Sequence, residues 1–332
     1  MKQVLLILLA LLTTATTEWA QTVDQEDVVR VESDVTNLPF TVTDKQHRFV
    51  TTLQAQDVRV LEDGVPQTLF TFQRETDRPL AIAFLIDVSI SQDATLPDEK
   101  AAARSFIENV IKSNRDLVAI LPFTGSAYLE QGLTRDVLSV YRVLERVEVA
   151  EPAYLGTGRP LTGIPTGPRL AATPPEGSTA IWDAVALTSS NVLSQAAGLR
   201  RRAIILLTDG IDTTSRLPLK EAANRALAAE TVVYTIGIGN SKLEGVYHDP
   251  LKEIAERTGG RAFFPDKKFD LNSAFAEIER ELRTQYLLAY SSTNKKRDGS
   301  YRKIAIEITN PDLRKQNLQL RHRPGYFAKP SG

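Results

Sequence analysis

A carboxylate and two hydroxyls follow one apolar run at alternate positions. Residues 84–91 read Phe-Leu-Ile-Asp-Val-Ser-Ile-Ser, so Asp87, Ser89 and Ser91 come at the end of a segment typical of a buried strand. Side-chain oxygens, with no histidine or cysteine among them, are the ligands that hard divalent cations prefer. The pattern therefore predicts part of a metal site. The alternative is N-cap chemistry for the helix that follows, which also favours Ser and Asp.

Two further loops carry oxygen donors. Thr179 lies in "GSTAIWDA", at the start of a predicted helix, and Asp209 lies in "ILLTDG", directly after an apolar run. In parallel α/β sheets, ligands bind at the carboxyl ends of the strands, where such loops meet. We predict that the three loops hold one ion, Mg²⁺, with Mn²⁺ or Ca²⁺ as alternatives. Each loop alone has a common structural explanation, a helix cap for Thr179 and a turn for "TDG", so the prediction depends on their convergence.

The elements that would position these loops alternate in type. Near-continuous apolar runs predict strands covered on both faces, and they alternate with segments of helical spacing. This order indicates an α/β fold with a doubly wound, mostly parallel sheet. The predicted strands are 79–89, 116–124, 201–210, 231–239 and 261–265, and the predicted helices are 98–113, 135–147, 181–198, 217–230, 249–259 and 271–285.

The flanking segments 28–75 and 286–327 alternate with a period of two, which is typical of strands. We predict that they pair as one smaller all-β sandwich, with the α/β domain inserted between them. The predicted organisation is a signal peptide at 1–20, an N-terminal β region at 24–77, an α/β domain at 78–283 with a Pro/Gly-rich insertion at 151–178, and a C-terminal β region at 284–329.

The N-terminus predicts export. Lys2 precedes the apolar run "VLLILLALL" at 4–12, and Ala20 precedes the predicted cleavage point, as in a secretory signal peptide. The run is shorter than the ~20 residues that a membrane span needs, so no transmembrane span is expected in the mature chain. The expected location is the periplasm, the cell envelope or the extracellular medium. A buried N-terminal helix is the alternative.

Composition excludes several classes of protein. The 332 residues contain 40 Lys and Arg against 41 Asp and Glu, a balance that gives no support to nucleic-acid binding. There is no cysteine, which rules out thiolate chemistry, and the three histidines are scattered, which argues against a Ser-His-Asp triad. The basic run 199–202 is interpreted as a solvated face. The sequence carries no signal for the oligomeric state.

Three segments of the chain together resemble a known metal site. "DVSIS", the Thr of "STAIWDA" and the Asp of "LLTDG" resemble, in order and sheet position, the metal-ion-dependent adhesion site of von Willebrand factor type A domains, over about residues 78–283. The flanks resemble a bacterial secreted family related to that domain. The resemblance implies that Ser89, Ser91 and Thr179 ligate the ion directly, and that Asp87 and Asp209 act directly or through water. It also implies a binding module, not an enzyme, in which the ion captures a carboxylate of a protein partner.

One departure keeps alternatives open. The family usually has glycine between the two serines, where this chain has Ile90, and we expect this β-branched residue to shift the loop. An envelope scaffold with an unoccupied site is therefore one alternative. A metal-assisted phosphatase of the haloacid-dehalogenase type is another, but it needs a second Asp where this chain has Ser89.

Overall fold

The computed structural model describes most of the chain after its N-terminal segment. The described residues are 35–74, 78–112, 114–150, 167–170, 178–196, 200–239, 245–265 and 268–330. The predicted signal peptide, the start of the N-terminal β region and most of the 151–178 insertion lie outside them.

A six-stranded sheet carries the residues predicted to do chemistry. Its strand order is β10-β9-β8-β5-β6-β7, parallel throughout except for β7, which runs antiparallel to β6. The strands are β5 (Leu80–Asp87), β6 (Leu117–Phe123), β7 (Gln131–Thr134), β8 (Arg201–Thr208), β9 (Thr231–Gly237) and β10 (Ala262–Phe263). Every residue of β5 is buried, because the sheet is covered on both faces. β7 was not predicted, since "QGLT" offers only one apolar side chain.

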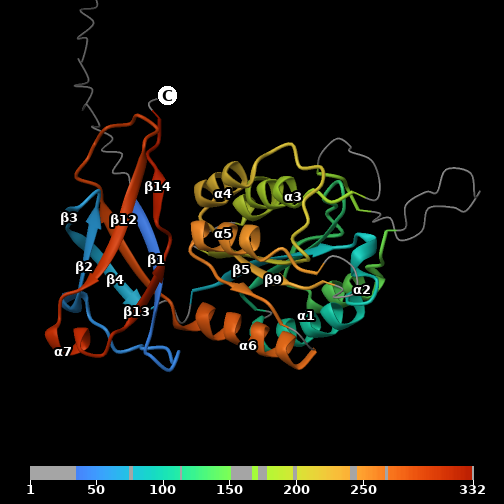
Figure 1. The fold of residues 1–332 in the computed structure, drawn as a ribbon, viewed down its shortest axis with the longest axis horizontal. Coiled ribbons are helices and arrows are strands. Elements are labelled where there is room, and N and C mark those ends of the chain that lie inside the picture. Colours follow the sequence, from blue (N-terminus) through green and yellow to red (C-terminus); the bar gives the residue numbers. More distant parts are fainter. Residues whose placement is uncertain are drawn as a thin grey trace, which may run out of the picture. The chain divides into compact units, whose positions relative to one another are not determined.

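Helices cover both faces of this sheet (Figure 1). The core on one face includes residues from α1 (Leu96–Val110), α2 (Val137–Arg146) and α6 (Lys268–Thr284). The core on the other face includes residues from α3 (Ile181–Leu187), α4 (Leu219–Ala228) and α5 (His248–Thr258). The predicted α/β architecture with a mostly parallel sheet is therefore confirmed.

The helix predicted over 181–198 is regular only in its first half. After α3 the chain continues as a π-helix (Thr188–Val192) and a 3₁₀ turn (Leu193–Gln195). The Ser189 hydroxyl donates to the Val185 carbonyl at 2.8 Å, one turn back. Such side-chain bonds compete with the backbone ladder and disturb a regular α-helix.

The flanking segments form two antiparallel sheets, in the orders β13-β1-β11-β4 and β14-β12-β2-β3. In each sheet an N-terminal strand pairs with a C-terminal one, β1 with β11 and β2 with β12. The two sheets share one hydrophobic core, which includes Phe40, Val60, Tyr286 and Ile304. The elements are β1 (Val35–Thr43), β2 (Val58–Glu62), β3 (Val65–Gln67), β4 (Leu69–Arg74), β11 (Tyr286–Ser291), β12 (Tyr301–Ile308), α7 (Pro311–Arg314), β13 (Gln319–His322) and β14 (Gly325–Phe327).

A buried ion pair links these N- and C-terminal strands. Arg302 of β12 lies 3.2 Å from Glu62 of β2, with side chains 2% and 1% exposed. The Tyr290 and Tyr326 hydroxyls both donate to Glu62 at 2.9 Å. Burial acts to raise the pKa of Glu62, but hydrogen bonds, including one from Ser292, outweigh it and lower the pKa below its usual value. The carboxylate is therefore held ionised in the core.

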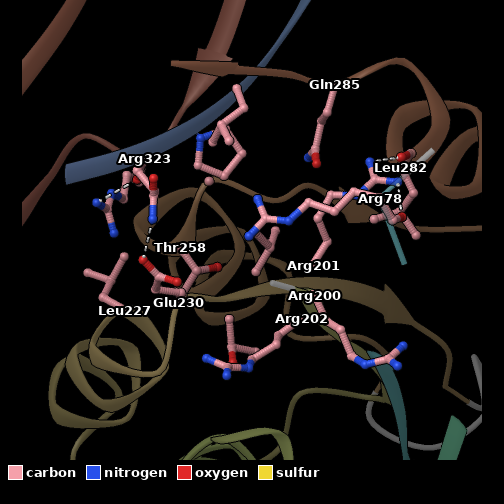
Figure 2. Close-up of a pocket in the computed structure, with 16 residues that line it drawn as sticks. Arg78, Arg200, Arg201, Arg202, Leu227, Glu230, Thr258, Leu282, Gln285 and Arg323 are labelled. Atoms are coloured by element: carbon pink, nitrogen blue, oxygen red, sulfur yellow. Dashed lines mark hydrogen bonds between the residues drawn. The ribbon is translucent and has the colours of Figure 1, made fainter. Parts of the chain in front are cut away.

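Two arginines of the basic run, Arg201 and Arg202, bind carbonyls at helix ends, and the interpretation of a solvated face is wrong for these two. Arg202 donates to the carbonyls of Ala229 at 3.0 Å and Ala196 at 3.3 Å, at the ends of α4 and of the 3₁₀ turn. Arg201, which is buried, donates to the Leu282 carbonyl in the last turn of α6. These bonds satisfy carbonyls that a helix end leaves without an intrahelical partner. Figure 2 shows the cavity of about 50 Å³ that these arginines line, which lies near the start of β8.

Candidate metal site

Asp87 is fixed at the carboxyl end of β5 by two hydrogen bonds. Its side chain is fully buried. One oxygen accepts from the Ser89 backbone N–H at 2.9 Å, and the other accepts from the Thr208 hydroxyl at 2.6 Å. Thr208 is the last residue of β8, which pairs directly with β5. The carboxylate therefore lies where two adjacent strands end.

Ser89 and Ser91 place their hydroxyls together. Their Oγ atoms lie 3.0 Å apart, and Ser89 is 5% exposed. Mg²⁺ binds oxygen in octahedral geometry at about 2.0–2.1 Å, so two neighbouring ligands at right angles lie about 3 Å apart. The separation of the two hydroxyls fits this geometry.

Ile90 adopts a backbone conformation that does not need glycine, and the shift of the loop that we expect from it stays a prediction. It begins a 3₁₀ turn (Ile90–Gln92), and its φ angle is not positive. This backbone is accessible to any L-residue, so glycine is not required here. The Ile90 side chain is 53% exposed and points away from the core.

Asp209 brings a second buried carboxylate to the same edge. It follows β8 and is 3% exposed. One of its oxygens accepts from the Ile211 N–H at 2.9 Å, and its carbonyl accepts from the Tyr247 N–H at 2.8 Å. Burial raises the pKa of Asp87 to about 6, although hydrogen bonds from Thr208 and Ser89 oppose this, and the charge of Asp209 raises it further. A cation would relieve this repulsion.

Thr179 is held by the loop that begins at Asp209. Its carbonyl accepts from the N–H groups of Thr213 at 2.8 Å and Thr214 at 3.1 Å, and its own N–H donates to the Thr213 hydroxyl at 2.8 Å. Within the described residues no hydrogen bond joins the Thr179 hydroxyl to the other predicted ligands. The structure thus brings Asp87, Ser89 and Ser91 into direct contact, places Asp209 within electrostatic reach, and connects Thr179 through the backbone.

Sequence reasoning missed two supporting residues. Thr208 lies within "ILLTDG" but had no predicted role. Its hydroxyl, at the end of a predicted buried strand, could have indicated a residue that supports the site. Gln92 is fully buried, with its Nε2 3.4 Å from the Ser91 hydroxyl and its Oε1 accepting from Thr95 at 2.9 Å. Nothing in the pattern distinguished Gln92 from a surface residue.

Two residues near Thr179 have structural roles. Asp183 accepts from the backbone N–H groups of Leu217 at 2.9 Å and Arg216 at 3.2 Å, so it anchors the loop after Asp209. Trp182 is 7% exposed and belongs to the sheet core.

The comparisons with known proteins identify the class. Residues 169–278 match the family model of the von Willebrand factor type A domain. This segment, residues 169–278, is thus identified with the von Willebrand factor type A domain, in agreement with the resemblance in the sequence. No curated protein matches the chain.

Solved structures share the fold at low identity. Proximal thread matrix protein 1 from the mussel byssus, with a zinc-occupied MIDAS motif, is 18% identical with a TM-score of 0.50, over 67% of this chain and 50% of that one. Von Willebrand factor type A from Catenulispora acidiphila is 13% identical with a TM-score of 0.49, over 90% of this chain and 74% of that one. BatB from Bacteroides thetaiotaomicron is 21% identical with a TM-score of 0.42, over 61% of this chain and 97% of that one. The match thus spans about half the length of the mussel protein.

Two properties of the described residues concern metal binding and membranes. Among these residues, no three histidine, aspartate or glutamate side chains gather closely enough to hold a metal by themselves. None of the described helices combines the length and the apolar character that crossing a bilayer requires.

Proposed function

We propose that this chain is an exported protein-binding module that uses one divalent cation to capture a carboxylate of a partner protein. Ser89, Ser91 and Thr179 would ligate the ion directly, and Asp87 and Asp209 would act directly or through water. The observation that carries this proposal is the 3.0 Å contact of the two serine hydroxyls beside two buried carboxylates.

The donor set favours a hard ion, and we propose Mg²⁺, with Mn²⁺ or Ca²⁺ as alternatives. All donors are oxygens, which suits these cations. Only two carboxylates belong to the proposed set and its other donors are neutral hydroxyls, so the ion stays electron-poor. An outside carboxylate is then a favourable further ligand.

Exposed apolar side chains beside the site support a protein partner. Ile90 is 53% exposed, and Tyr247, whose N–H binds the Asp209 carbonyl, is 50% exposed. Aromatic and apolar groups around a polar centre are typical of protein interfaces. Export to the periplasm, envelope or extracellular medium rests on the N-terminal sequence, and N-terminal sequencing of the mature protein would test it.

Metal titration combined with partner capture tests the proposal. Calorimetry with Mg²⁺ and Mn²⁺ should show binding to the wild type, and immobilised protein should retain a partner from an envelope extract only without chelator. Thr179→Ala should abolish both, while Thr52→Ala, at an exposed threonine, should keep both. Capture that persists in chelator and in Thr179→Ala contradicts the mechanism.

The same titration separates this proposal from its alternatives. A scaffold with an empty site gives no heat of metal binding. A phosphatase would need a general-acid carboxylate two residues after Asp87, and Ser89 stands there. We therefore expect no phosphatase turnover. Turnover that is lost in Asp87→Asn would favour the hydrolase instead.

A further inference from the structure

Glu99 is a buried carboxylate without a hydrogen-bond partner. It lies in the first turn of α1 and is 1% exposed, and neither of its oxygens accepts a hydrogen bond within the described residues. The Thr95 hydroxyl, four residues earlier, donates to Gln92 instead, at 2.9 Å to its side-chain oxygen. Leaving a buried carboxyl unpaired costs free energy, so its presence calls for an explanation.

The position of Glu99 connects it with the candidate metal site. Leu96, Ala102 and Ala103, three and four residues away on α1, are buried in the core over the sheet. Glu99 shares this face. Burial is the main cause that raises its pKa to about 8, the nearby Thr95 hydroxyl opposes this, and the charges of Asp87 and Asp209 raise the pKa further. The geometry agrees: the Glu99 N–H donates to the Thr95 carbonyl at 3.1 Å, Thr95 donates to Gln92, and Gln92 lies 3.4 Å from the Ser91 hydroxyl. Glu99 therefore lies next to the loop that carries the predicted ligands.

A purely structural explanation for Glu99 is weak. No salt bridge joins it to a lysine or arginine within the described residues. The helix dipole favours acidic groups in a first turn, but the partly exposed Asp98 beside it already serves that purpose. Gln would fill the same volume without a buried charge.

We propose that Glu99 is an outer-sphere positioning residue of the metal centre, which accepts a hydrogen bond from a water ligand of the ion. This inference rests on the proposed function. The contact runs through water because no three acidic side chains of the described residues lie close enough to ligate one ion together. Mg²⁺ keeps several waters when proteins bind it, and a buried carboxylate would orient one of them.

The test compares metal affinity with stability in the absence of metal. The full chain is titrated with Mg²⁺ and Mn²⁺ by calorimetry as wild type, Glu99→Gln, Glu108→Gln and Asp209→Asn, and each is melted in chelator. Glu108 is the matched control, since it lies on the same helix with its side chain 52% exposed. Loss of an outer-sphere partner typically weakens metal binding about 10- to 100-fold.

The expected result is a loss of affinity of that size in Glu99→Gln, with a metal-free melting temperature equal to or above that of the wild type. Glu108→Gln should bind like the wild type. Unchanged affinity in Glu99→Gln overturns the inference alone. A loss of affinity that accompanies a lower metal-free melting temperature also overturns it, because it indicates a structural role. If the wild type gives no heat and equals Asp209→Asn, the proposed function fails and this inference fails with it.

Discussion

At the scale of single residues, the site consists of carboxylates that are buried before any cation is present. Asp87 has two hydrogen bonds and Glu99 has none, and burial raises the pKa of both. Without metal, the fold must bury negative charge or take up protons. Stability and the proposed metal binding would therefore be coupled through the same side chains.

This coupling predicts a pH dependence of the metal-free protein. The pKa of Glu99 rises from an ordinary 4.5 to about 8 in the folded state, so the folded chain binds more protons than the unfolded chain within that window. The free energy of unfolding should then fall as pH rises from about 4.5 to 8, and level off above it. Urea denaturation in chelator at a series of pH values measures this.

Glu99→Gln is the control for the pH prediction. It should remove the slope above about pH 6, while Asp87, with its pKa raised to about 6, keeps a slope of the same sign below that value. An unchanged slope above pH 6 in this variant would show that Glu99 is ionised in the folded protein.

Thr208 provides a second prediction at this scale. Thr208→Val removes the 2.6 Å hydrogen bond to Asp87 but keeps the shape of the side chain. Hydrogen bonds to charged groups contribute about 1.5–3 kcal/mol, so the free energy of unfolding at neutral pH should fall by about that amount. Metal affinity should also fall, because Asp87 loses its orientation. Denaturation and calorimetry measure both, and a variant with wild-type values would show that Thr208 does not position Asp87.

At the scale of elements, the buried Glu62–Arg302 pair ties β2 to β12. Arg302→Met should leave Glu62 as an uncompensated buried charge, and such losses cost about 3–5 kcal/mol. The same two strands carry an exposed pair, Arg59 and Glu307, with side chains 49% and 41% exposed. Arg59→Met should cost only about 0–1 kcal/mol. Equal effects of the two substitutions in chemical denaturation would contradict this assignment.

How far the sequence predicts these elements depends on how their side chains are covered. β5, β6, β8 and β9 were predictable because burial on both faces leaves continuous apolar runs. β7 was not, because Leu133 is its only apolar residue. For the site, Asp87, Ser89 and Ser91 carry a local pattern. The bond from Thr208 to Asp87 joins residues 121 positions apart, so no local pattern shows it.

Glu99 marks another limit of pattern reading. A glutamate within a helix normally faces solvent, and the apolar residues around it predict the helix without predicting its burial. Its position three residues before Ala102, on the buried face of α1, was the available signal. Only the packing of that face on the sheet shows that Glu99 is enclosed.

At the scale of the whole molecule, the predicted domain organisation is testable by proteolysis. β1 pairs with β11 and β2 with β12, so neither flanking segment has its partners alone. We expect limited proteolysis to leave a stable fragment of roughly residues 78–283 that retains metal binding. A protease-resistant N-terminal fragment without the C-terminal strands, identified by mass spectrometry, would contradict the pairing.

The same pairing sets an order for biogenesis. Arg59 in β2 meets Glu307 in β12 across 248 positions of the chain, and ribosomes add about 5–20 residues per second. The first strands to be made therefore wait on the order of 10–50 s for their partners, with their edges open to other chains. We expect this interval to be when the nascent polypeptide most needs a chaperone, and a truncation before β11 to aggregate.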